Sequence, residues 1–187
     1  SAYLKIHRGG PAFLLESVVG GNRIARYSFI GTEPANLITT WQNSHENPFE
    51  LLGKHLDIKG YINTPGLPKF CGGVVGYLSY EAICKIEKLP TPSKDPVNVP
   101  ECMFMLVESM LVFDHVKHQI KAIAHIDLEG DIEAEYKQAQ AKIEELLSRL
   151  NQPIPVDTRP APARKPAEEP TANFKQQEFE DGVIKLK

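Results

Sequence analysis

At 187 residues the chain is long enough for one domain with a real core, with room for a trailing segment. Its 21 basic and 24 acidic residues give a formal net charge of -3 without long runs of either sign, which excludes the basic stripe of a nucleic-acid-binding surface. Three cysteines without CxxC spacing favour reduced thiols in a cytoplasmic location, and no stretch reaches the roughly 20 apolar residues that span a membrane.

The first 41 residues are dominated by strand patterns. Residues 12–19 (AFLLESVV) and 23–30 (RIARYSFI) each predict a strand. The Gly-Gly-Asn turn at 20–22 tolerates positive φ, so the two strands are expected to form a hairpin. Residues 36–41 (NLITTW) predict a third strand, because β-branched side chains are enriched there.

The middle of the chain predicts one helix, one strand and one loop. Asn47 is suited to cap a helix and Pro48 to its first turn. Residues 72–80 (GGVVGYLSY) are apolar, aromatic and interrupted by glycine, which is typical of a strand with close backbone neighbours. Residues 89–100 contain four prolines and are expected to form a loop.

A long apolar run at 102–113 predicts one central strand that is buried on both faces. Residues 119–126 (QIKAIAHI) follow a polar turn, so a second hairpin is expected here. Residues 131–150 have the period of an amphipathic helix, with an apolar face expected at Ile132, Tyr136, Ala139, Ile143, Leu146, Leu147 and Leu150.

The last part of the chain changes character. Residues 151–170 contain six prolines and few large apolar side chains, which predicts a semi-rigid linker. Residues 171–187 regain a helical pattern. Together the elements predict an α+β fold of mainly antiparallel strands and hairpins, with two or three covering helices.

Residues that could carry chemistry are scarce. The chain has none of the GxGxxG, GxxxxGK[ST], GxSxG or HExxH motifs. The glycines at 72–76 lead into a strand pattern rather than a helix, so a structural role is favoured. His115 and His118 have a spacing that suits a metal only on a helix, whereas a turn is predicted there.

The segment around Ser17 is the best candidate for a ligand site. Strand alternation places Ser17 on the same face as Leu15 and sends Glu16 to the opposite face. A serine at the end of an apolar face suits a small ligand with an apolar body and polar ends, and Glu16 could balance an ammonium group. A regular strand cannot point both side chains into one pocket, and taken alone both also fit ordinary surface positions.

The most distinctive segment of the chain is FLLESVVGGNRIARYSFIGTEP at 13–34, which contains the motifs LLES and RYSFIG. It resembles the N-terminal part of anthranilate synthase component I, with Ala25 where that family more often has glycine. FCGGVVGYLSYE at 70–81 resembles a second signature of the family. TANFKQQEFEDGVIKLK at 171–187 is similar to the helix that opens its chorismate-binding domain. The motifs occur in the family's order across nearly the whole chain.

The resemblance implies an N-terminal regulatory, tryptophan-binding domain at 1–150, a proline-rich linker at 151–170 and the start of a chorismate-binding domain at 171–187. Because an initiating Met is absent and a new helix follows the linker, we expect the chain to be part of a longer protein. In this family LLES belongs to the feedback site for L-tryptophan. The residues that the resemblance assigns to that allosteric site are Ser17, Glu16, Leu15, Arg26, Tyr27 and Ser28.

The resemblance also implies the activity of the full-length enzyme. It would be a lyase of tryptophan biosynthesis that converts chorismate and glutamine-derived ammonia to anthranilate and pyruvate. Its partner would be a glutamine amidotransferase subunit (component II), and Mg²⁺ would be bound by the C-terminal domain. No catalytic or metal-binding residue is expected within this chain, which alone would be inactive.

Two alternatives stand beside this interpretation. Aminodeoxychorismate synthase component I is a sister family with a shared fold. A stand-alone ligand-binding module without an enzymatic partner domain is the second.

Overall fold

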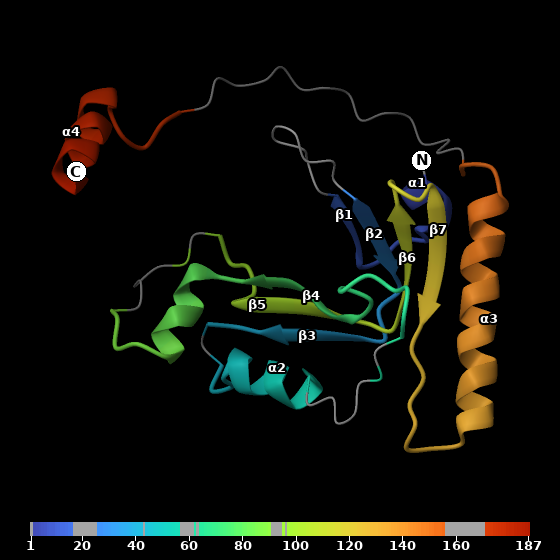
Figure 1. Ribbon diagram of the computed structural model, residues 1–187. Coiled ribbons are helices and arrows are strands. Elements are labelled where there is room, and N and C mark those ends of the chain that lie inside the picture. The colour runs from blue at the N-terminus through green and yellow to red at the C-terminus, as the bar shows by residue number, and fades with distance from the viewer. Residues whose placement is uncertain are drawn as a thin grey trace. The chain divides into compact units, whose positions relative to one another are not determined.

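Two antiparallel sheets form the framework of residues 1–155, one of the two units into which the chain divides (Figure 1). The four-stranded sheet has the order β1-β2-β6-β7, and the three-stranded sheet has the order β3-β5-β4. The strands are β1 Ala12–Glu16, β2 Tyr27–Thr32, β3 Asn36–Thr40, β4 Gly73–Leu78, β5 Cys102–Val107, β6 Ser109–Asp114 and β7 Gln119–Ala124. The computed structural model describes residues 2–16, 26–42, 44–56, 62, 64–90, 95, 97–155 and 171–187. The expected α+β fold is confirmed.

The longer helices begin where the sequence predicts. The side chain of Asn47 accepts a hydrogen bond from the Phe49 amide at 2.9 Å and caps α2. The side chain of Asp131 accepts one from the Ala134 amide at 3.2 Å and caps α3. Two short helices, α1 and η1, were not predicted because five or six residues carry no periodic stripe. The helices of this unit are α1 Ala2–Ile6, α2 Pro48–Leu56, the 3₁₀ helix η1 Tyr80–Lys85 and α3 Ile132–Asn151.

The apolar run at 102–113 is two strands, and the prediction of one strand was wrong. The run breaks at Glu108, where the chain passes from β5 in the three-stranded sheet to β6 in the four-stranded sheet (Figure 1). Each strand has a neighbour on both sides, β5 between β3 and β4 and β6 between β2 and β7. Two successive central strands therefore produce a nearly continuous apolar pattern, which only Glu108 and Ser109 interrupt at the crossing.

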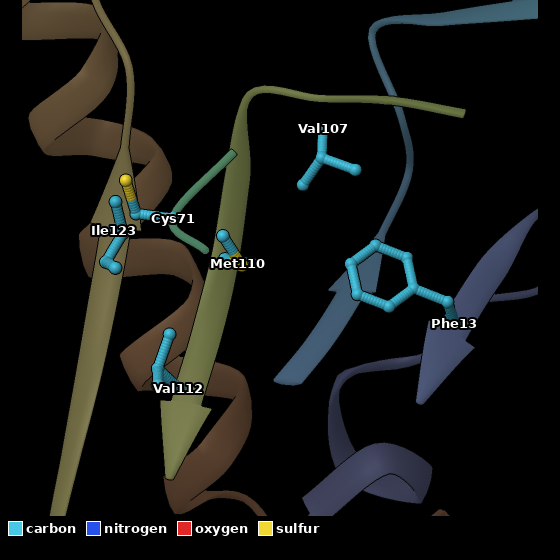
Figure 2. Packing of buried hydrophobic residues seen from close by; sticks show 6 residues of the cluster. All are labelled: Phe13, Cys71, Val107, Met110, Val112 and Ile123. Atoms are coloured by element: carbon cyan, nitrogen blue, oxygen red, sulfur yellow. The ribbon is translucent and has the colours of Figure 1, made fainter. Parts of the chain in front are cut away.

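The main core lies between the two sheets. Phe13 from β1 and Ile123 from β7 meet residues from β5, β6 and the segment before β4 (Figure 2). Partly buried residues from β4 and β5 complete the cluster from the side of the three-stranded sheet. Its buried members are Phe13, Cys71, Val107, Met110, Val112 and Ile123.

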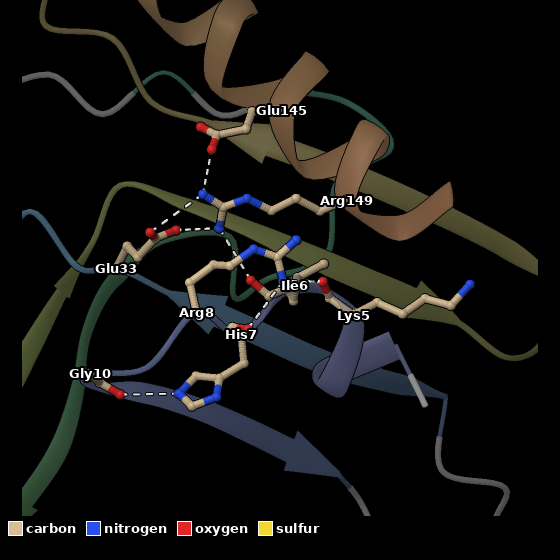
Figure 3. A network of polar contacts seen from close by, with 8 residues as sticks. All are labelled: Lys5, Ile6, His7, Arg8, Gly10, Glu33, Glu145 and Arg149. Atoms are coloured by element: carbon tan, nitrogen blue, oxygen red, sulfur yellow. Dashed lines mark hydrogen bonds and ion pairs between the residues drawn. The ribbon is translucent and has the colours of Figure 1, made fainter. Parts of the chain in front are cut away.

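A second core lies on the other face of the four-stranded sheet, beneath α1 and α3. It consists of Ile6, Ile30, Leu111 and Leu146. Arg149 of α3 links α3 to α1 and to the end of β2 (Figure 3). Its Nη1 donates a hydrogen bond to the Ile6 carbonyl at 3.1 Å, and its guanidinium also pairs with Glu33 and Glu145. Of the apolar face predicted for α3, Ala139 and Leu146 are buried, while Ile132, Tyr136 and Leu147 remain exposed.

Two glycines of the cluster at 72–76 allow close packing. A Cβ on Gly76 would lie 1.9 Å from the carbonyl oxygen of Met103 in β5, and one on Gly72 would lie 2.2 Å from Nε2 of His125. That nitrogen in turn lies 2.7 Å from the Cys71 carbonyl oxygen. The glycines therefore have the structural role that the sequence favours.

The second unit, 156–187, contains the helix α4 Gln176–Leu186, as the pattern at 171–187 predicts. Asn151 is the last residue of α3, and 156–170 lie outside the described residues. The domain boundaries taken from the resemblance stay predictions. Within the described part of the chain, every helix is too short or too polar to cross a membrane.

Candidate functional site

The pairing of β1 with β2 fixes which of the six predicted ligand residues share a face. The strands are antiparallel, with Leu15 opposite Phe29 and Glu16 opposite Ser28. Directly opposed side chains lie on the same face of a sheet, and successive side chains alternate. Leu15 therefore shares a face with Phe29 and Tyr27, while Glu16 shares the opposite face with Ser28. The pairing expected from a hairpin is present, and its turn at 20–22 lies outside the described residues.

The face that carries Leu15 is mainly aromatic, and we call Leu15, Tyr27, Phe29 and the neighbouring Phe70 the aromatic wall. The rings of Tyr27 and Phe29 lie 5.9 Å apart, and Phe29 meets Phe70 edge to face at 5.2 Å. Tyr27, Phe29 and Phe70 pack against the core between the sheets, which fixes their positions. Leu15 remains 42% exposed. This face is thus apolar, with aromatic rings that are partly buried and a Leu15 side chain that is exposed.

The positively charged side chain of Arg26 lies at one end of the aromatic wall. The guanidinium of Arg26 lies 4.8 Å from the centre of the Tyr27 ring, within the range of a cation–π contact. Its Nη2 is 3.1 Å from Oδ2 of Asp114, and its Nε is 3.4 Å from Oδ1. This hydrogen-bonded pair raises the pKa of the Arg26 guanidinium and lowers the pKa of the Asp114 carboxyl, so both stay charged near neutral pH.

The opposite face holds the other two described candidates. The Oγ of Ser28 lies 2.7 Å from Nε2 of His115, and Ser28 is buried. Glu16 is exposed at the end of β1. The structure therefore places Leu15 and Tyr27 on one face of the sheet, with Arg26 over the Tyr27 ring, and places Glu16 and Ser28 on the other face.

Ser17 lies outside the described residues. Strand alternation continued by one residue beyond Glu16 predicts that it joins the face of Leu15. That position stays a prediction.

Sequence reasoning missed two residues that contact these candidates, Asp114 at the end of β6 and His115 directly after it. Asp114 is buried and pairs with Arg26, and His115 contacts Ser28. The sequence does not favour a metal at His115 and His118 and predicts a turn there. His118 occupies that turn with φ of 52°, and within the described residues no three His, Cys, Asp or Glu side chains gather into a metal site. A charged Asp at the end of a buried strand was the available signal.

Two hollows lie beside α3, and the smaller one is also lined by Phe13 of β1 and Gly31 of β2. Cavities of about 250 Å³ and 450 Å³ are both lined by Glu108 and Lys142, which form an ion pair at 3.0 Å. Neither of these two cavities is lined by Leu15, Arg26 or Tyr27. Tyr27 and Phe29 are partly buried against the core, whereas Leu15 and Arg26 are exposed.

Comparison with known proteins places the chain in one family. The family model described as chorismate binding enzyme matches residues 10–187. Anthranilate synthase component 1 of Acetivibrio thermocellus is 32% identical over 100% of this chain and 41% of its own length. The protein of the same name from Saccharomyces cerevisiae is 36% identical over 85% of this chain and 34% of its own length.

A solved structure agrees with these relatives. The crystal structure of anthranilate synthase component I from Streptococcus pneumoniae superimposes with a TM-score of 0.57 at 25% identity, over 74% of this chain and 32% of that one. The chain thus spans about two fifths of the length of the curated relatives it matches most fully, in their N-terminal part. The resemblance to anthranilate synthase component I is confirmed, and the chain belongs to the family of chorismate-binding enzymes.

Proposed function

We propose that this chain is the N-terminal, regulatory part of an anthranilate synthase component I. The observation that carries the proposal is the register of β1 and β2, in which Leu15 of the LLES motif lies opposite Phe29 of the RYSFIG segment. By strand alternation Tyr27 lies on the same face, and the Arg26 guanidinium lies over its ring. The name shared by the relatives supports the same enzyme. The sister enzyme, aminodeoxychorismate synthase, is the alternative that the experiment below must exclude.

The reaction proposed for the full-length enzyme is the conversion of chorismate and glutamine-derived ammonia to anthranilate and pyruvate. Its proposed partner is a glutamine amidotransferase, component II, and its proposed location is the cytoplasm, which the cysteine usage favours. The described residues do not fit Mg²⁺, because no three potential ligands lie together. We propose that the Mg²⁺ site lies in the part of component I that this chain does not span.

We propose that the aromatic wall binds L-tryptophan as a feedback inhibitor. An indole ring requires apolar walls, which Leu15, Tyr27 and Phe29 supply. The Arg26 guanidinium at the end of the wall suits the carboxylate of an amino acid, since its planar fork forms charge-assisted hydrogen bonds with carboxylates. Ser17, which the resemblance assigns to the feedback site, follows Leu15 at the two-residue period of a strand, so we propose that it also contacts the ligand.

Glu16 and Ser28 would contribute differently. Because their side chains lie on the far face of the sheet, we propose that Glu16 reaches the ligand through its backbone and that Ser28 supports β2 through His115. The amine of tryptophan would then be bound by backbone carbonyls or by residues outside this chain.

The experiment that tests the proposal uses the full-length component I that carries this chain. We expect anthranilate fluorescence from chorismate, Mg²⁺ and ammonia, and a fall in its rate when L-tryptophan is added. The purified 187-residue chain should give no fluorescence above a buffer blank. Accumulation of aminodeoxychorismate in place of anthranilate would assign the chain to the sister enzyme, and a full-length protein without either activity would favour a binding module.

A further inference from the structure

Arg26 is held by a partner that lies 88 residues further along the chain. Asp114 receives hydrogen bonds from both Nε and Nη2 of Arg26, at 3.4 Å and 3.1 Å. The side chain of Asp114 is 2% exposed, whereas that of Arg26 is 45% exposed. The pair therefore joins a buried, fixed anion to a cation that reaches the surface.

Asp114 is itself fixed by the turn between β6 and β7. Its Oδ1 accepts hydrogen bonds from the backbone amides of Val116 at 3.2 Å and Lys117 at 3.1 Å. The main chain adds a further link, because the amide of His115 donates to the Arg26 carbonyl at 2.8 Å. A carboxylate with this many partners has little freedom to move, so it can define the position of whatever it binds.

Arg26 is consequently held on both sides. Its guanidinium rests over the Tyr27 ring, 4.8 Å from the centre, while one edge of the fork faces Asp114. Nη1 is not part of the pair with Asp114, and nearly half of the side-chain surface is open to solvent. The guanidinium N–H groups that do not face Asp114 can therefore donate hydrogen bonds to an anion at the end of the aromatic wall.

We propose that Asp114 is a positioning residue of the tryptophan site, which holds Arg26 in the orientation that receives the ligand's carboxylate. The inference rests on the proposed function, because it requires that tryptophan binds beside Arg26. A free arginine must lose rotamer freedom when it binds a ligand, and Asp114 imposes that order before the ligand arrives. Loss of this ordering is expected to weaken tryptophan binding about two- to tenfold, the factor for immobilising one long side chain.

The test is Asp114→Asn in full-length component I, with dissociation constants measured by calorimetry. Asn keeps an Oδ1 that can accept from Val116 and Lys117, so the turn is retained while the charge is removed. We expect weaker binding of L-tryptophan and unchanged binding of tryptamine, which has the indole and amine but no carboxylate. Glu33→Gln is the matched control, because it removes a carboxylate that pairs with Arg149 at the opposite end of β2. It should leave both affinities unchanged.

A double-mutant cycle separates positioning from folding. In an Arg26→Gln background, Asp114→Asn should add no further loss of tryptophan affinity, because a positioning residue acts only through the residue it holds. Equal losses for tryptophan and tryptamine, or a loss that persists without Arg26, would overturn the inference. So would an Asp114→Asn protein with the parent's tryptophan affinity, and in that case the proposed function stands. A parent enzyme that does not bind tryptophan contradicts the proposed function itself, and the inference with it.

A measurement without any variant covers the case in which Asp114→Asn fails to fold. Crystal structures of the parent with and without L-tryptophan should keep the Arg26–Asp114 pair, with Arg26 also within hydrogen-bonding distance of the ligand carboxylate. An Arg26 side chain that leaves Asp114 when tryptophan binds would overturn the positioning role.

Discussion

Two neighbouring leucines of β1 allow the proposed ligand face to be tested with an internal control. Leu14 and Leu15 are 43% and 42% exposed, but Leu14 lies opposite Ile30 and Leu15 opposite Phe29, so their side chains point to different faces of the sheet. Only Leu15 belongs to the aromatic wall. We therefore predict that Leu15→Ala weakens L-tryptophan binding and that Leu14→Ala does not.

The expected loss of tryptophan affinity in Leu15→Ala follows from the exposed fraction of the Leu15 side chain. Full burial of a leucine side chain contributes about 1.5–3 kcal/mol. Because 42% of Leu15 is still open, a ligand that covers it gains up to about 0.6–1.3 kcal/mol. Removal of that contact corresponds to a rise in the dissociation constant of about three- to eightfold. The cost in folding stability should be similar for the two variants, at about 1–3 kcal/mol, since both side chains are half buried.

The assay is calorimetric titration of full-length component I with L-tryptophan, accompanied by thermal unfolding of each variant. Similar melting temperatures together with a selective loss of affinity in Leu15→Ala would support the face assignment. Equal affinities for the two variants, or a greater loss in Leu14→Ala, would refute the reasoning.

Three further predictions concern the fold. Gly76→Ala should lower the melting temperature by at least the equivalent of about 1–3 kcal/mol, because its Cβ would lie 1.9 Å from the β5 backbone. Gly53→Ala in α2 should raise stability by about 0.5–1 kcal/mol, since nothing lies within 4 Å of its Cβ. Equal melting temperatures for the two variants would contradict this contrast. The lowered pKa of Asp114 means that its carboxylate stabilises the fold above pH 3.8 and that this contribution is lost as pH falls through the lower, folded-state pKa. Acid unfolding followed by circular dichroism should therefore lose part of its pH dependence below pH 3.8 in Asp114→Asn, and identical acid profiles would argue against it. Limited proteolysis should cleave first within 151–170, where six prolines and few apolar residues occur, and early cleavage within 102–113 would show that the core is not independently stable.

The elements that could be predicted from the sequence are those with strong local signals. The caps Asn47 and Asp131 mark the starts of α2 and α3 because each side chain can satisfy an amide of the first turn. The β6–β7 hairpin follows from two apolar segments around a polar turn. Strand alternation also separates Glu16 from Leu15 correctly, because it depends only on the two-residue period of a strand.

Features that depend on distant contacts could not be predicted. The apolar pattern at 102–113 is the same for one strand or for two, and only the pairing of β5 and β6 with different neighbours distinguishes them. The contact between Asp114 and Arg26 crosses 88 residues, so no local pattern reveals it. In the sequence alone Arg26 resembles an ordinary surface arginine, and only the structure shows that it lies beside Tyr27 and Asp114.

The central claim is that the segment from Leu15 to Ser28 carries the tryptophan feedback site. Its most direct test compares the tryptophan inhibition constant of anthranilate formation in the parent component I with that in Ser17→Leu. The substitution removes a hydroxyl and fills ligand volume, each of which costs about 1–3 kcal/mol, and about 1.4 kcal/mol corresponds to a factor of ten. We predict an inhibition constant at least about tenfold higher in the variant. Superimposable inhibition curves for the two enzymes would contradict the claim.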